Sequence, residues 1–426
     1  MAFACAAVLN GSFFWLRRVG ALDPERHRLY YARFHHTERY FATPEELEAV
    51  RRFTAALYRP DGWLVVCKGT KDAVLAAFLV ASVWMSLSGW RFKKVGPPPI
   101  AVGALAFLAA MFAESVPRLG WLMTIAGLRS FAFLLVAAVG GWAATGTDLR
   151  FLARILKALL VLQAVLVPIE LWRGIHLFRA HFFGSPFGDR VVGTMLQPTT
   201  LGVLAVTAYV FHRTFAGEPR RDPWVLGAAI VVVFFTASGT ALLLMAAAVA
   251  WDLLTRARRP HLLAAGLCLV LMMTALPRIT GRPDILDSFW GRVDAVTLRF
   301  SGVPTHVLMW GYGLGAASNT AYNLLRDWSK EGGQGGPLFV ADSTPTLLLA
   351  QTGLVGLVLV YGLIATAAYR DVQARPLYVL LVLASLALNL PEAFPMSVIL
   401  GLLLARSLGP AAPTGEAGLP VVGPAL

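Results

Sequence analysis

Residues Thr346–Tyr369 read TLLLAQTGLVGLVLVYGLIATAAY, a run that contains no Asp, Glu, Lys or Arg. A helix of about 20 apolar residues crosses the roughly 30 Å hydrocarbon core of a bilayer, and this run is long enough to do so. It lacks the strict apolar and polar alternation of a membrane-spanning strand. The segment therefore predicts a transmembrane helix.

The rest of the chain has the same character. Of its 426 residues, 57% are hydrophobic and 14% are charged, whereas about 25% are charged in soluble proteins. We expect an all-α integral membrane protein with about 12 crossings. The expected spans are Met1–Leu16, Ala73–Trp90, Ile100–Glu114, Trp121–Ala144, Leu152–Leu171, Val192–His212, Trp224–Phe235, Thr240–Leu254, His261–Leu276, Thr346–Tyr369, Leu377–Leu390 and Met396–Arg406.

Polar stretches divide the chain into five predicted parts. Residues 1–71 hold a first helix and a polar segment, and residues 72–276 form a transmembrane bundle. Residues 277–343 form a large polar loop, residues 344–408 the last three helices, and residues 409–426 a flexible tail. Pro391 and Pro395 break any continuous helix near the end of the bundle, which favours paired short or re-entrant helices there.

The net charge of +13 does not indicate nucleic acid, because Lys and Arg cluster at the ends of apolar runs and form no single basic face. If crossings alternate, one face collects Arg91–Lys94, Arg213, Arg220, Arg221, Arg256, Arg258, Arg259, Arg370 and Arg375. By the positive-inside rule that face is cytoplasmic, and the loop 277–343 lies on the external side. Arg17 and Arg18 do not fit this alternation. The three cysteines are too scattered for a disulfide framework or a zinc site.

Four patterns fall on the predicted external side. They are DRVVGTMLQPTTLGVLAV from Asp189, SFWGRVDAV from Ser288, GYGLGAASN from Gly311 and DSTPTLLLAQTGLVGL from Asp342. A long loop of mixed charge next to such helices is a candidate active site.

In order, spacing and topology these patterns resemble the O-antigen ligase and polymerase superfamily, over roughly residues 72–406. The resemblance implies a GT-C-like fold in the bacterial inner membrane, with the active site in a large periplasmic loop before the last three helices. It also implies a glycosyltransferase that takes glycan from undecaprenyl pyrophosphate, with no cofactor or metal, in O-antigen, lipopolysaccharide or exopolysaccharide synthesis. A chain-length regulator or a flippase would be its protein partner.

The same resemblance separates two activities. Ligases usually carry His where this chain has Asp342, and Asn is common where it has Ser343. A carboxylate at this place is similar to that of many polymerases. We therefore expect a polymerase of lipid-linked repeats, with a ligase that passes glycan to lipid A core or protein as the alternative.

The residue types suit that reaction. Asp342 can accept the proton of an acceptor hydroxyl, and the guanidinium groups of Arg190 and Arg292 can hold a leaving pyrophosphate without a metal. Other interpretations stay open. Asp342 could cap a helix, Arg190 could anchor a helix end, and Arg292 could pair with a nearby aspartate.

The predicted substrate-binding residues are Arg129, Gln197, Ser343 and Gly313. Arg129 lies inside a predicted span, where a cation needs a partner, so it either contacts phosphate or pairs with Glu114, Glu170 or Glu392. The glycines from Gly311 to Gly315 indicate a tight turn more than a phosphate cradle. A secondary transporter that uses Arg129, Glu170 and Glu392 is the alternative from another functional class.

Overall fold

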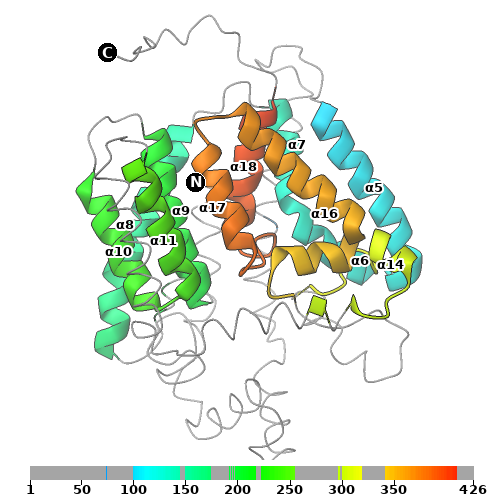
Figure 1. Ribbon diagram of the computed structural model, residues 1–426, viewed down its shortest axis with the longest axis horizontal. Helices are drawn as coiled ribbons and strands as arrows, with labels where there is room; N and C mark the ends of the chain where they lie inside the picture. Colours follow the sequence, from blue (N-terminus) through cyan, green and yellow to red (C-terminus); the bar gives the residue numbers. More distant parts are fainter. Residues whose placement is uncertain are drawn as a thin grey trace, which may run out of the picture.

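The computed structural model describes residues 73, 99–143, 149–173, 191, 193, 195, 197–216, 222–254, 296–297, 300–318 and 341–409, and these contain helices but no strand (Figure 1). The helices are α5 (Pro99–Leu119), α6 (Trp121–Leu128), the 3-10 turn η3 (Arg129–Phe131), α7 (Ala132–Ala143), α8 (Leu149–Arg173), α9 (Pro198–Phe215), α10 (Pro223–Thr236), α11 (Gly239–Leu254), α14 (Thr305–Trp310), α16 (Thr344–Arg370), α17 (Arg375–Ser385) and α18 (Met396–Leu408).

Four helical segments in this part of the chain are long and apolar enough to cross a membrane. They are Val102–Leu119, Trp121–Ala138, Leu149–Trp172 and Thr344–Arg370, and shorter apolar helices accompany them. The all-α class is therefore confirmed for the described residues, and these helices are consistent with a membrane protein. The total of about 12 crossings stays a prediction. The expected spans Met1–Leu16 and His261–Leu276, and nearly all of Ala73–Trp90, lie outside the described residues.

Two predicted boundaries need correction. The span expected from Val192 begins only at Pro198, because proline favours the first turn of a helix and Gly193 before it has a left-handed φ of 52°. The span expected to reach Leu390 ends at Ser385, and residues 386–395 form a turn-rich connection. The predicted break at Pro391 and Pro395 is confirmed.

The helices form two packed groups joined by α17. On the left of Figure 1, α9 packs against α8, α10 and α11, whereas on the right α7 packs against α5 and α18. Helix α17 contacts α9 and α11 on one side and α16 on the other. Helix α17 therefore joins the two groups into one bundle.

Small residues allow the closest helix contacts. A Cβ on Gly401 of α18 would lie 2.6 Å from Val136 Cβ of α7 and 2.7 Å from Phe133 O. A Cβ on Gly202 of α9 would lie 2.5 Å from Ala241 Cβ of α11. Such small residues let the backbones of membrane helices approach each other, as the dispersion-driven packing of helices in lipid requires.

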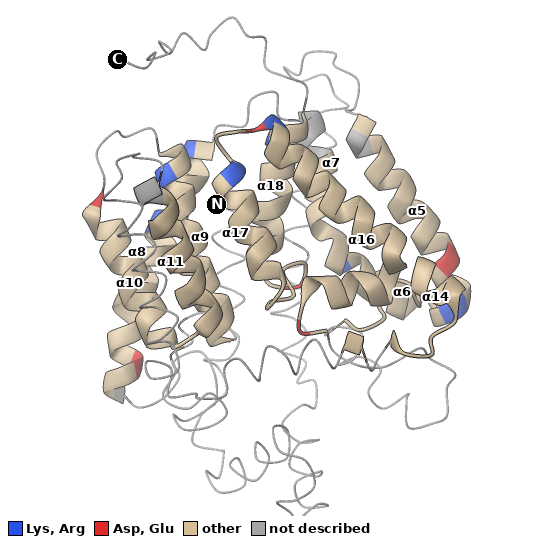
Figure 2. Ribbon diagram, in the orientation of Figure 1, with Lys and Arg blue, Asp and Glu red and all other residues tan. Residues whose placement is uncertain are grey.

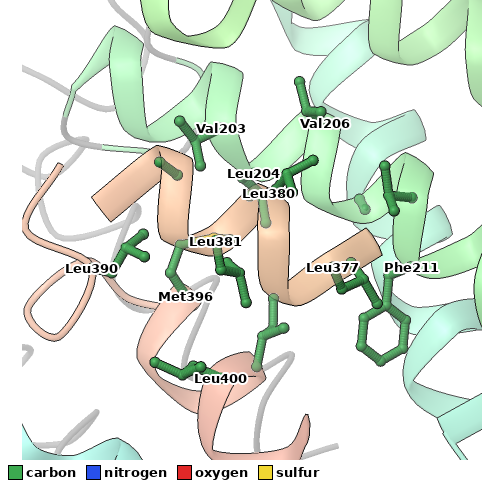
Figure 3. Packing of buried hydrophobic residues seen from close by; sticks show 14 of the residues in the cluster. Val203, Leu204, Val206, Phe211, Leu377, Leu380, Leu381, Leu390, Met396 and Leu400 are labelled. Atoms are coloured by element: carbon green, nitrogen blue, oxygen red, sulfur yellow. The ribbon is translucent and has the colours of Figure 1, made fainter. Parts of the chain in front are cut away.

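Apolar side chains fill the centre between α9, α17 and α18 (Figure 3). Leu377 and Leu381 of α17 are almost fully buried, as are Val203 of α9 and Met396 of α18. Lipid tails are as apolar as these side chains, so close packing stabilises the contact more than exclusion from water does.

Charged residues gather toward the ends of the helices, and the bodies of the helices are mostly uncharged (Figure 2). Arg213, Arg370 and Arg375 share one end of the bundle, where Gln373 Nε2 donates to Thr214 O at 2.8 Å. Asp342 precedes α16 at the opposite end. This agrees with the expected common face for the three arginines.

Candidate functional site

Asp342 lies immediately before the N-terminal cap of α16, and its side chain is exposed. The cap itself is Ser343, whose Oγ accepts a hydrogen bond from Thr346 N at 3.4 Å and lies 2.8 Å from Thr346 Oγ1. The interpretation of Asp342 as this helix cap is therefore wrong. Its carboxylate has no hydrogen bond or ion pair within the described part of the chain. It is thus available to bind a ligand or accept a proton.

Four hydrogen bonds hold the segment around Asp342. Ala341 N donates to Ala317 O at 2.9 Å, and Ala341 O accepts from Asn389 Nδ2 at 3.4 Å. The Thr344 hydroxyl donates to Leu388 O at 2.9 Å and accepts from Leu390 N at 3.0 Å. These contacts join the start of α16 to the connection between α17 and α18, so the position of Asp342 is fixed by segments far apart in the sequence.

A partly buried line of hydrogen bonds leads inward from this point, and we call it the polar chain: Ala341, Asn389, Glu392, Ser130 and Gln351. Asn389 Nδ2 donates to Glu392 Oε2 at 3.0 Å, and Ser130 Oγ donates to Glu392 Oε1 at 3.1 Å. Gln351 Nε2 makes a longer contact of 3.5 Å with Ser130 Oγ. Polar side chains therefore connect Asp342's neighbourhood to the interior of an apolar bundle.

The polar chain has unused hydrogen-bonding capacity. The oxygens Gln351 Oε1 and Asn389 Oδ1 are buried and have no hydrogen-bond partner in the described structure. Gln351 is 0% exposed and Asn389 is 6% exposed, so leaving these oxygens unpaired is costly. Both atoms are acceptors, which means that only an O–H, an N–H or a cation could satisfy them.

Arg129 occupies the 3-10 turn between α6 and α7, next to Ser130 of the polar chain. It lies eight residues after Trp121, the first residue of α6, and therefore about 12 Å along the helix from that end. All three expected partners have contacts of their own: Glu114 pairs with Arg118 at 2.9 Å, Glu170 accepts a hydrogen bond from Gly193 N at 3.1 Å, and Glu392 accepts one from Ser130, the residue next to Arg129.

Gly313 belongs to the stretch Gly311–Ser318, which packs its backbone against α5, α6 and α16. Gly311, Gly313 and Gly315 all have positive φ, and a Cβ on Gly315 would lie 2.3 Å from Met123 O. Leu314 N donates to Ser115 Oγ at 2.7 Å. Because protein atoms already use this N–H, the tight-turn interpretation accounts for the glycines without a bound phosphate.

The stretch also supports a break in α16. Gly353 has φ 62° and ψ −163°, so the helix is interrupted there. Tyr312 N donates to Ala350 O at 2.7 Å, which satisfies a carbonyl at the break. Helix α14 packs against the same point, where a Cβ on Gly353 would lie 2.2 Å from Met309 O. The start of α16 is thus a separate short helix that carries Ser343 and ends near Gln351.

The remaining predicted site residues lie elsewhere in the chain. Gln197 is exposed and precedes α9, but its side chain makes no capping hydrogen bond. Arg190 and Arg292 lie outside the described residues. Within the described residues, no three His, Cys, Asp or Glu side chains come together. The polar chain therefore links the backbone beside Asp342 and Ser343 to Ser130 beside Arg129, whereas Gln197 lies at the start of α9.

Sequence reasoning missed Ser130, Gln351, Asn389 and Thr344. Of these four, only Gln351 and Asn389 have a signal in the sequence. Each is an amide within an apolar run, and burying an amide there costs free energy unless it has a partner or a function.

Comparison of the whole chain with protein-family models, with curated proteins and with solved structures gave no match.

Proposed function

We propose that this chain is a glycosyltransferase of the bacterial cytoplasmic membrane that joins oligosaccharide repeats carried on undecaprenyl pyrophosphate. One observation carries the proposal: Asp342 has an exposed carboxylate, and its backbone is held beside a partly buried polar chain in an otherwise apolar bundle. Apolar packing alone has no need for such a group.

In the proposed reaction, Asp342 accepts the proton of the acceptor hydroxyl. The acceptor oxygen then bonds to the anomeric carbon of the donor, and the bond from that carbon to the phosphate oxygen breaks. The lipid pyrophosphate leaves with both electrons of that bond. Arg190 and Arg292 would neutralise its charge, as guanidinium forks do for phosphates.

The unpaired oxygens of the polar chain suit a carbohydrate. Sugar hydroxyls are hydrogen-bond donors, and neither Gln351 Oε1 nor Asn389 Oδ1 has a donor in the described structure. The side of the membrane follows from charge. Arg213, Arg370 and Arg375 lie at the end opposite Asp342, and the positive-inside rule would make that end cytoplasmic and the Asp342 end periplasmic.

Replacement of Asp342 by Asn tests the proposed base. The variant is expected to lower glycan elongation about 100-fold or more, because general base catalysis contributes at least that factor. Glu114→Gln is the matched control, since Glu114 is a half-exposed carboxylate paired with Arg118 outside the polar chain. Equal chain lengths in the two variants would remove Asp342 from the chemistry.

Replacement of Arg190 or Arg292 by Lys tests the pyrophosphate contacts. A lysine keeps the charge but loses the two-pronged geometry, so each variant is expected to slow turnover with protein levels unchanged. Wild-type rates in both variants would show that the leaving group is stabilised elsewhere.

Deletion of the gene separates polymerase from ligase. A missing polymerase leaves single repeats transferred onto the acceptor, whereas a missing ligase leaves long chains on the lipid carrier. We expect the first pattern.

A secondary transporter is the second candidate, and the broken helices favour it. The turn at η3, the interruption at Gly353 and the connection 386–395 all lie beside the polar chain, and transporters bind substrates between such discontinuous helices. Solute flux in proteoliposomes that is lost in Glu392→Gln but retained in Asp342→Asn would support this function over transfer.

A further inference from the structure

A groove lies at the end of the bundle opposite Asp342. It has a volume of about 260 Å³ and is formed by the last turns of α9, by α11 and by α17. Most of its wall is apolar, including Leu244 and Trp251 of α11 and Val379 and Leu383 of α17. Trp251 is 41% exposed, and Val379 and Leu383 are each 44% exposed, so the groove opens at the surface of the bundle.

The groove has one polar end. Arg213, Thr214 and Gln373 line it, and Gln373 is held by Arg406 Nη2, which donates to Gln373 Oε1 at 2.7 Å. The last turns of α9, α11 and α18 and residues 370–375 together carry four arginines, Arg213, Arg370, Arg375 and Arg406, against two acids, Asp252 and Asp371. Of these acids, Asp371 pairs with Arg406 at 3.1 Å. The polar end of the groove is therefore cationic.

We propose that this groove binds an anionic phospholipid, with its phosphate at Arg213 and one acyl chain along Leu244, Val379 and Leu383. A cationic end that continues into an apolar wall matches the headgroup and tail of such a lipid. An acyl chain has no polar groups to pair, whereas an extended peptide would leave its backbone polar groups unpaired against the apolar wall. The proposal does not depend on the glycosyltransferase function.

Fluorescence quenching provides the test. The full-length protein is reconstituted in vesicles that contain either brominated phosphatidylglycerol or brominated phosphatidylcholine. The chain has 12 tryptophans, so the difference between wild type and Trp251→Phe isolates the signal of Trp251. We expect phosphatidylglycerol to bind at this site about five-fold more tightly than phosphatidylcholine, the ratio that corresponds to about 1 kcal/mol for one arginine near an anionic headgroup.

Two variants show whether the groove is responsible. Arg213→Gln is expected to abolish the preference for phosphatidylglycerol. Arg370→Gln removes the same charge from the same end without touching the groove, and is expected to keep the preference. Ala248→Leu fills the wall of the groove and should reduce quenching of Trp251 by both lipids.

Three results would overturn the proposal: equal quenching by the two lipids in wild type, a preference that survives in Arg213→Gln, or no quenching of Trp251 by either lipid. The last result would mean that another polypeptide covers the groove. If Trp251→Phe fails to fold, native mass spectrometry replaces quenching. One phosphatidylglycerol fewer must then stay bound to Arg213→Gln than to Arg370→Gln, and equal numbers would refute the site.

Discussion

Replacement of Gly353 by alanine should disrupt the packing of α14 against the break in α16. Gly353 has a φ of 62°, a conformation that L side chains rarely adopt. The added Cβ would lie 2.2 Å from Met309 O, 2.3 Å from Met309 C and 2.5 Å from Trp310 N. These are backbone atoms of α14, which cannot rotate away as a side chain could.

The expected loss of stability follows from two terms. Backbone strain at a non-glycine residue costs about 1–3 kcal/mol, and displacement of packed neighbours costs about another 1–3 kcal/mol. The free energy of unfolding should therefore fall by about 2–6 kcal/mol. Gly362→Ala in the same helix is the matched control, because nothing lies within 4 Å of its added Cβ. That change should raise stability by about 0.5–1 kcal/mol, since alanine is the better helix former.

Denaturant unfolding of both purified variants in one detergent, followed by tryptophan fluorescence, measures the difference. We expect Gly353→Ala to unfold at a much lower denaturant concentration than Gly362→Ala. Equal midpoints for the two variants would refute the broken-helix geometry and the contact with α14.

Two further predictions concern the polar chain and the helix ends. Asn389→Asp turns a donor into a carboxylate beside Glu392, so the free energy of unfolding at pH 7 should fall by at least about 2 kcal/mol. Glu392→Gln should restore much of it in the double variant, and additive losses in the double-mutant cycle would contradict the contact. Lys157 donates a hydrogen bond to Asp222 and holds the pKa of Asp222 below its ordinary value of 3.8. The stabilisation by this ion pair should be complete above pH 3.8 and fade as the pH falls through the lowered pKa of Asp222. Asp222→Asn and wild type should therefore differ in thermal unfolding at pH 6 and converge in acid. A pH-independent difference would count against the ion pair.

Composition was enough to predict most of the helices. Apolar runs mark α5, α8 and α10 within a few residues, because length and hydropathy alone decide whether a helix can cross lipid. The break near Pro391 was also predictable, since proline cannot donate to a helix and clashes within it.

The interruption at Gly353 was not predictable, because Gly353 lies in a continuous apolar run that favours an unbroken helix. The break depends on the backbone of Met309, which is distant in sequence. The same limit applies to the site. Ser130 and Glu392 are 262 residues apart, and no periodicity in either segment indicates that they meet. Asp342 and Ser343 are both residue types that can cap a helix, and in the structure Ser343 is the cap. The next residue, Thr344, contacts the α17–α18 connection, which no local pattern indicates.

The central claim is that Asp342 accepts a proton during glycan transfer, and the lipid-linked and polymerised glycans made by Asp342→Asn test it most directly. The account predicts unpolymerised repeats, with the variant present in the membrane at the level of Glu114→Gln, which should give normal chains. Chains of normal length from Asp342→Asn would contradict it.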